Sequence, residues 1–174
     1  MIPREKRIIF IDMDGTLIKT LSGEPFPRCI SDFQPLWNTW NVLKDWFNSR
    51  NDMETCYIFI VTNQEGVGKG LVVEDYLRVK IDFISKALHE YLDPKELFPN
   101  KLVVDYHYSI TKDRFRKPNT GMLEVLLSEY ELDYVNKDEM VMIGDASGLI
   151  GDFSDTDKKT AFNFGIDYID RRTL

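Results

Sequence analysis

The feature that most constrains this chain is the alternation of short apolar runs with longer segments of helical periodicity. The apolar runs have the length and composition of buried strands, and they cover residues 7–12, 56–61, 102–106, 140–143 and 168–169. Helical periodicity covers residues 35–50, 73–92, 121–131 and 155–164. Strands that alternate with helices predict an α/β fold built on a doubly wound, Rossmann-like parallel sheet.

Three segments between these elements have loop composition. Residues 17–33 contain glycine, proline and serine with some alternation, and we expect a hairpin-like flap there. Residues 66–70 (GVGKG) are expected to form a glycine-rich loop, and residues 112–117 (KDRFRK) a basic loop. The sequence has no internal repeat and no low-complexity linker. At 174 residues, we therefore expect a single domain over residues 1–174.

Polar side chains occur where the predicted strands end. Asp12 and Asp14 follow the first strand, Thr62 follows the second, Lys117 lies in the basic loop after the third, and Asp145 follows the fourth. In open α/β sheets, ligands bind beyond the carboxyl ends of the strands, so these side chains should converge. Carboxylates held close together repel one another, and a bound cation relieves that repulsion. Oxygen ligands of this kind favour Mg²⁺.

Four short motifs carry a family resemblance. The pentapeptide DMDGT occupies residues 12–16, and VTN, RKP and GD follow at residues 61–63, 116–118 and 144–145. In sequence and order they resemble the four motifs of the haloacid dehalogenase (HAD) phosphatase superfamily, whose first motif is DxDx[TV]. The resemblance implies a HAD-like fold and a phosphatase, which is a phosphoric monoester hydrolase.

The resemblance also implies a role for each motif residue. Asp12 would be the nucleophile that forms an aspartyl-phosphate, and Asp14 the general acid and then the base. Thr62 would donate a hydrogen bond to a phosphoryl oxygen, and Lys117 would neutralise the nucleophile and the transferred group. Asp12, the backbone carbonyl of Asp14, and Asp145 would hold Mg²⁺.

Longer stretches narrow the resemblance to one branch. Residues 12–33, 61–70, 144–148 and 152–166 are similar to the corresponding segments of polynucleotide kinase 3′-phosphatase domains. This similarity implies a Mg²⁺-dependent enzyme of DNA end repair that removes 3′-phosphates from DNA ends. The residues expected to bind substrate are Thr16, Ser22, Asn63, Lys69 and Arg116.

The sequence departs from this branch in two places. Lys69 stands where the family carries an arginine, which keeps the charge and loses the bidentate geometry. The segment over residues 146–152 is shorter than in the animal enzymes. Neither interval between the motifs, residues 14–35 or 62–117, has room for the large cap of many small-molecule HAD enzymes. We therefore expect a capless site, or one with a small flap, that admits the end of a polymer.

Two other functions stay open. The first is a capless HAD phosphatase that acts on a small molecule such as a nucleotide or a sugar phosphate. Several such enzymes carry a zinc loop, whereas residues 106–116 contain His107 and no cysteine. The second is a module that binds phosphorylated ends without hydrolysis, for which a nucleophile and an acid would be unnecessary.

Asp157 has two interpretations. With Ser154 it fits a capping box at the start of the helix predicted over residues 155–164, with aspartate in place of the usual glutamate. Alternatively, Asp157 lies near the metal.

Composition limits the partners of the chain. The 22 basic and 29 acidic residues give a net charge of −7, which argues against a protein that coats nucleic acid but not against one that holds a single end. Cys29 and Cys56 are too few for a disulfide framework, and we expect reduced thiols in a cytoplasmic monomer that does not bind membranes. No P-loop motif is present, so we expect no kinase activity. A DNA-repair kinase or ligase is a candidate partner.

Overall fold

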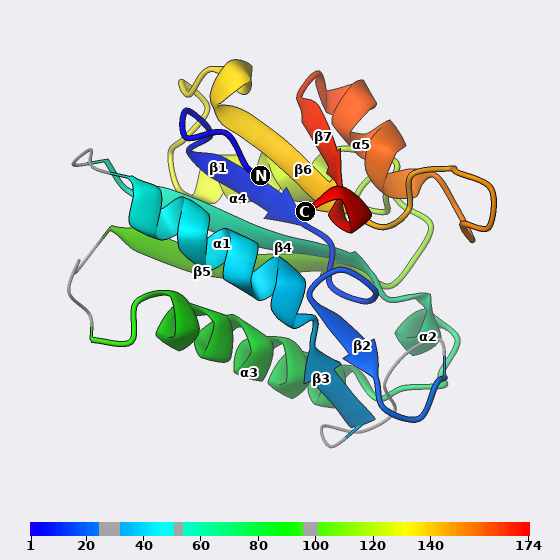
Figure 1. Ribbon diagram of the computed structural model, residues 1–174. Coiled ribbons are helices and arrows are strands. Elements are labelled where there is room, and N and C mark those ends of the chain that lie inside the picture. The colour runs from blue at the N-terminus through cyan, green and yellow to red at the C-terminus, as the bar shows by residue number, and fades with distance from the viewer. Residues whose placement is uncertain (25–31, 51–53, 96–100) are drawn as a thin grey trace.

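A five-stranded parallel sheet forms the centre of the computed structural model, which describes residues 1–24, 32–50, 54–95 and 101–174 (Figure 1). The strands are β1 (Ile8–Ile11), β4 (Cys56–Asn63), β5 (Leu102–Ser109), β6 (Met140–Gly144) and β7 (Asp167–Asp170). Their order in the sheet is β5-β4-β1-β6-β7. From β1 the chain runs outward through β4 and β5 and then returns to β6 and β7. The carboxyl end of β1 therefore lies at the switch point of the topology, where such sheets bind ligands.

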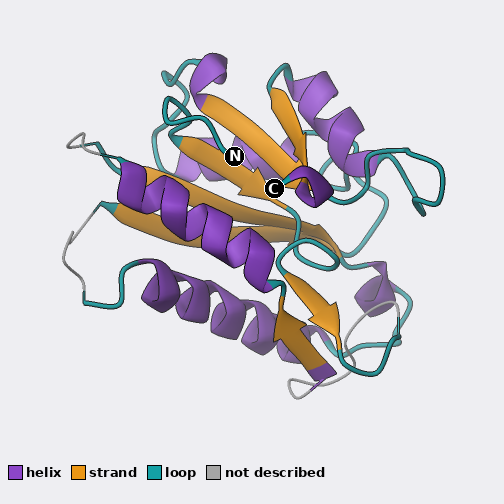
Figure 2. Cartoon of the chain, in the orientation of Figure 1, coloured by secondary structure: helices purple, strands orange, loops and turns teal. Residues whose placement is uncertain are grey.

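Helices cover both faces of the sheet (Figure 2). The main helices are α1 (Trp37–Ser49), α3 (Glu74–Leu92), α4 (Gly121–Glu129) and α5 (Thr156–Phe164). Apolar side chains of α1 and α3 pack on one face, and those of α4 and α5 pack on the other. The predicted doubly wound α/β sheet is thereby confirmed. None of the helices in the described part of the chain is long and apolar enough to cross a membrane.

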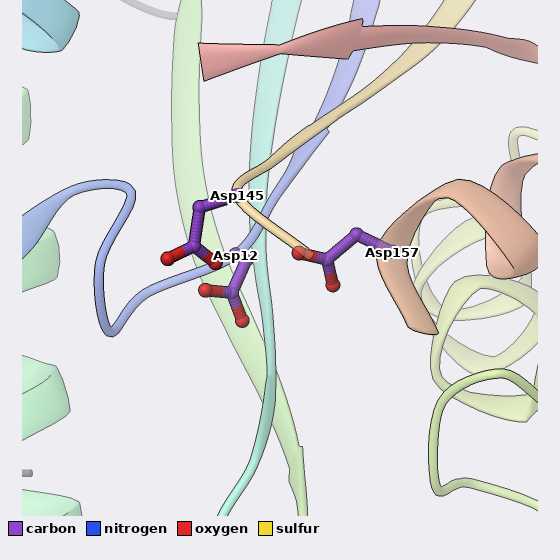
Figure 3. A group of neighbouring side chains, drawn as sticks. All are labelled: Asp12, Asp145 and Asp157. Carbon is purple, nitrogen blue, oxygen red and sulfur yellow. The ribbon is translucent and has the colours of Figure 1, made fainter. Parts of the chain in front are cut away.

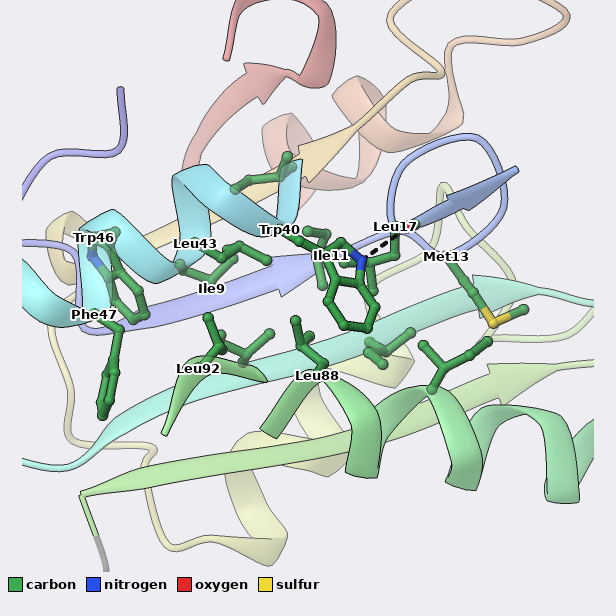
Figure 4. Close-up of a cluster of buried hydrophobic side chains, with 14 of the residues drawn as sticks. Ile9, Ile11, Met13, Leu17, Trp40, Leu43, Trp46, Phe47, Leu88 and Leu92 are labelled. Carbon is green, nitrogen blue, oxygen red and sulfur yellow. Dashed lines mark hydrogen bonds between the residues drawn. The ribbon is translucent and has the colours of Figure 1, made fainter. Parts of the chain in front are cut away.

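The central strand explains why the apolar runs are continuous. Ile9 and Ile11 of β1 join the cluster under α1 and α3 (Figure 4). Phe10 joins the cluster under α4 on the other face. A strand buried on both faces needs apolar residues at every position. Trp40 of α1 donates its indole N–H to the backbone oxygen of Leu17 at 2.9 Å, which ties α1 to the segment just after the first motif.

The predicted flap is a small antiparallel pair in its described part. Strand β2 (Ile18–Thr20) pairs with β3 (Phe33–Pro35), and residues 25–31, which include Phe26 and Cys29, lie outside the described residues. The predicted start of the helix over residues 35–50 is wrong, because Pro35 pairs with Ile18 and α1 begins at Trp37. The pairing of the flap, which the local sequence does not reveal, takes this residue into a strand.

Other predicted boundaries also move. The expected loop over residues 66–70 contains a short helix, α2 (Glu65–Gly68). Strand β5 continues beyond residue 106 to Ser109, because it pairs with β4 along its full length. Between Thr62 and Lys117 the described residues form α2, α3 and β5, with no cap domain among them.

Candidate active site

A pocket of about 560 Å³ opens beyond the carboxyl ends of the central strands. Its lining brings together five residues from separate parts of the chain, namely Asp12, Asp14, Thr62, Lys117 and Asp145. These are the residues for which the motifs imply catalytic or metal-binding roles. They meet because the parallel arrangement places the ends of β1, β4 and β6 at one edge of the sheet.

Three carboxylates form a cluster in this pocket (Figure 3). Asp12 follows β1, Asp145 follows β6, and Asp157 lies in the first turn of α5; each offers an oxygen within 4.8 Å of the others. Glycines allow this approach. A Cβ atom on Gly144 would lie 2.2 Å from Asp157 Oδ2, and one on Gly15 would lie 2.1 Å from Asp145 Oδ2. The glycines of the first and fourth motifs therefore make room for the carboxylates.

A buried ammonium joins two of these carboxylates. Lys117 is 2% exposed, and its Nζ donates to Asp12 Oδ1 at 2.6 Å and to Asp157 Oδ1 at 2.7 Å. Asn63 holds the backbone of Lys117 from the end of β4, because its side chain accepts from Lys117 N at 2.9 Å and donates to Lys117 O at 3.1 Å. Asn63, expected to bind substrate, lines the pocket, but here its amide positions Lys117.

Burial controls the ionisation of this cluster. It raises the pKa of Asp12 to about 8, although Lys117 acts in the opposite direction. Burial and the charge of Asp157 raise the pKa of Asp145 to about 6. Burial alone would lower the pKa of Lys117, but the two contacting carboxylates outweigh it and raise that pKa. Without a further cation, the carboxylates are therefore incompletely neutralised.

The donor set fits a magnesium ion. The clustered carboxylates offer hard oxygen donors, and Asp145 Oδ1 is buried without a hydrogen-bond partner among the described residues. A buried acceptor with no partner is costly unless a cation or a donor meets it.

The structure contradicts the capping-box interpretation of Asp157. The N-cap residue of α5 is Asp155, and Asp157 is 1% exposed, with Oδ2 accepting from Ala146 N at 3.1 Å. The first turn of α5 faces the end of β6, so this carboxylate meets Lys117 and the loop instead of its own helix terminus. The interpretation that places Asp157 near the metal fits this geometry.

Asp14 has neighbours that the sequence analysis missed. Gln64 Nε2 donates to Asp14 Oδ2 at 2.7 Å and to Thr62 Oγ1 at 2.9 Å. Lys80 of α3 lies 3.8 Å from Asp14 Oδ1 and is 3% exposed. The sequence does indicate that Lys80 is unusual, because this lysine falls on the buried stripe of its helix, three residues after Leu77.

The remaining substrate-binding candidates are placed differently. Lys69 and Arg116 line the pocket, and both pair with Glu65, at 3.2 and 3.1 Å. Thr16 is fully buried, and its hydroxyl has no hydrogen-bond partner in the described part of the chain. Ser22 is exposed on the flap and does not line the pocket.

Known proteins resemble this chain in sequence and in fold. The model of the family described as polynucleotide kinase 3 phosphatase matches residues 7–171. A bifunctional polynucleotide phosphatase/kinase of Schizosaccharomyces pombe is 32% identical over 167 residues, which cover 95% of this chain and 36% of that protein. A probable D-glycero-D-manno-heptose-1,7-bisphosphate 7-phosphatase of Thermoplasma volcanium is 27% identical over 153 residues, which cover 85% of this chain and 91% of the relative.

A solved structure shares the fold. It is the D,D-heptose 1,7-bisphosphate phosphatase of B. bronchiseptica, complexed with magnesium and phosphate, and it superposes with a TM-score of 0.66 at 18% identity. The match covers 93% of this chain and 78% of that one.

Fold and relatives together define a phosphatase of the HAD-like class, a phosphoric monoester hydrolase. Within that class, the chain belongs to the polynucleotide kinase 3 phosphatase family. The resemblance found in the motifs is thereby confirmed. The chain spans only about a third of the length of the S. pombe relative, which is named as both a phosphatase and a kinase.

Proposed function

We propose that this chain is a Mg²⁺-dependent phosphatase that removes the phosphate from the 3′ end of DNA. The observation that carries the proposal is the floor of the pocket. There Lys117 joins Asp12 to Asp157, next to an Asp145 oxygen that has no hydrogen-bond partner in the described part of the chain. The chain is also a member of the polynucleotide kinase 3 phosphatase family.

The chemistry follows from two carboxylates two residues apart. Asp12 attacks the phosphorus, and the bond to the 3′ oxygen of the DNA breaks while Asp14 gives that oxygen a proton. The product of this step is an aspartyl-phosphate on Asp12. Asp14 then takes a proton from water as the water attacks the phosphorus, which releases inorganic phosphate and restores Asp12.

Fixed groups of the chain stabilise the charge that develops on the phosphoryl oxygens. Lys117 lies beside Asp12, and Thr62 lines the same pocket with a hydroxyl that can donate. Asp12, Asp145 and the backbone carbonyl of Asp14 would hold Mg²⁺, while Asp157 keeps Lys117 in place. When bound, the ion neutralises charge on the phosphoryl group.

A second candidate is a phosphatase of small phosphorylated molecules. The T. volcanium relative supports it, because that protein is named as a probable heptose bisphosphate phosphatase and the match covers most of both chains. Glu65 pairs with both Lys69 and Arg116, and these ion pairs leave less free positive charge at the rim of the pocket for a nucleic acid.

A substrate panel separates the two candidates. The rate of phosphate release, as kcat/KM, is measured on a 3′-phosphorylated DNA oligonucleotide, its 5′-phosphorylated isomer, nucleoside monophosphates and sugar phosphates, with Mg²⁺ or with EDTA. We expect the 3′-phosphorylated DNA to exceed every monomer by at least about tenfold, and EDTA to abolish release. A preference for monomers would overturn the DNA assignment, and full activity in EDTA would overturn the metal.

We also propose that a kinase or ligase acts on the same ends. The S. pombe relative is named as a bifunctional phosphatase and kinase, which supports a kinase that shares these substrates.

A further inference from the structure

One cation of the pocket has no role in the mechanism described above. Lys80 lies on α3 with its Nζ 3.8 Å from Asp14 Oδ1, and it lines the pocket with Tyr76, which precedes it by one helical turn. Lys80 is 3% exposed, whereas Tyr76 is half-buried.

The ammonium of Lys80 is poorly satisfied. Among the described residues, Asp14 Oδ1 at 3.8 Å is its only acidic neighbour within 4 Å, which is beyond hydrogen-bond distance, and Lys80 makes no side-chain hydrogen bond to any of them. Asp14 meanwhile accepts a hydrogen bond from Gln64 through its other oxygen. Burial lowers the pKa of Lys80 more than Asp14 raises it. The side chain of Lys80 is buried but lines the pocket, so an anionic ligand there would supply the close acceptor that the ammonium lacks among the described residues.

The position of Asp14 indicates what that ligand is. Asp14 would protonate the leaving oxygen, so the part of the substrate beyond that oxygen lies on the side of Asp14 and Lys80. In a 3′-phosphorylated strand, the leaving oxygen belongs to the terminal sugar, and the next anionic group along the strand is the phosphodiester on the 5′ side of that sugar.

We propose that Lys80 binds this phosphodiester and thereby makes the enzyme prefer the end of a polynucleotide to a mononucleotide. The inference rests on the proposed 3′-phosphatase function. Lysine is a suitable residue for this contact because it acts as a point charge toward phosphate oxygens. Tyr76 then offers an aromatic surface beside the terminal nucleotide.

The experiment removes either partner of this contact separately. Three substrates are compared by kcat/KM: a 3′-phosphorylated dinucleotide, the same molecule with an uncharged methylphosphonate linkage, and the nucleoside 3′-monophosphate. Each is tested with the wild type, Lys80→Met and Lys80→Arg. Lys86→Met is the matched control, because Lys86 is exposed on the same helix and the substitution removes the same charge.

The proposal predicts a coupled result. The wild type prefers the phosphodiester dinucleotide to the other two substrates by about 10- to 100-fold, mainly through KM. Lys80→Met removes that preference, because it loses more activity on the phosphodiester dinucleotide than on the methylphosphonate or the mononucleotide. Lys80→Arg retains most of the preference, and Lys86→Met retains all of it.

Two results would overturn the proposal. One is an equal loss on all three substrates in Lys80→Met, which would mean that Lys80 acts through Asp14 or through the fold. The other is a wild type that hydrolyses the methylphosphonate and phosphodiester dinucleotides equally well. This second test uses the wild type alone, so it does not depend on whether the variants fold. A wild type active only on other phosphomonoesters would instead refute the proposed 3′-phosphatase function itself, and this inference with it.

Discussion

The three clustered carboxylates differ in how their charges are balanced. Asp12 and Asp157 share the ammonium of Lys117, whereas Asp145 Oδ1 has no partner among the described residues. The pKa of Asp145, raised to about 6 by burial and by Asp157, expresses the same imbalance. The incompletely neutralised carboxylates therefore destabilise the metal-free protein, and binding of a cation restores that stability.

The substitution Asp145→Asn is expected to stabilise the metal-free protein. A carboxylate whose pKa is raised by folding lowers stability as pH rises from about 4 to about 6, and the full penalty applies above that range. At pH 8 the variant should gain about 1 kcal/mol after allowance for partial solvent exposure, or about 2–4 °C in Tm. At pH 4 the gain should vanish, and activity should be lost at every pH.

Thermal unfolding in EDTA at the two pH values measures this effect. Asp133→Asn is the matched control, because Asp133 is exposed and outside the pocket. A fall in Tm for Asp145→Asn at pH 8 in EDTA would show that its charge is well satisfied without metal.

At the scale of elements, the loop between β6 and α5 is fastened to the end of the chain. Arg172 lies in η3 (Arg171–Thr173), and it pairs with Asp152 at 2.8 Å and donates to Ser147 Oγ at 2.7 Å. Asp152 also accepts from the backbone N–H groups of Ser147 and Leu149. Arg172 and Ser147 hold the pKa of Asp152 well below its usual range. These contacts fix the loop that carries Asp145.

The substitution Arg172→Gln should loosen this loop. We expect the Mg²⁺ concentration that gives half-maximal activity to rise about 10-fold, with a much smaller change in kcat at saturating Mg²⁺, because the ligands remain but are less well positioned. A magnesium titration of phosphatase activity measures the shift. Arg4→Gln, which removes the same charge from an exposed position, should leave the titration unchanged. An unaltered magnesium titration in Arg172→Gln would show that the contacts of Arg172 do not position the metal ligands.

The elements that were predicted well from the sequence are those whose bounds depend on the local pattern of apolar and polar residues. The strand ends near Asp12, Thr62 and Asp145 followed from apolar runs that stop at polar residues, although β4 continues to Asn63. Pro35 was misassigned because its pairing with β2 depends on a flap contact. Asp157 was ambiguous because a helix-starting pattern does not reveal what the helix end faces.

At the scale of the whole molecule, the parallel sheet brings motifs that are far apart in the sequence together in one site. Asp12 and Lys117 are 105 positions apart in sequence and 2.6 Å apart in space. The sequence alone could identify such residues through family resemblance, but it could not give their distances, nor the neighbours Gln64 and Lys80 that no motif marked. The net charge of −7 and the pairing of Glu65 with the basic rim favour weak non-specific binding to DNA.

The central claim is that Asp12 is the nucleophile of a 3′-phosphatase, and one measurement tests it most directly. Phosphate release from a 3′-phosphorylated DNA oligonucleotide in Mg²⁺ is compared for the wild type, Asp12→Asn and the exposed control Asp133→Asn. We predict a loss of at least about 10³-fold for Asp12→Asn, with Tm within about 4 °C of the wild type, and no loss for Asp133→Asn. Turnover by Asp12→Asn close to that of the wild type would contradict the claim.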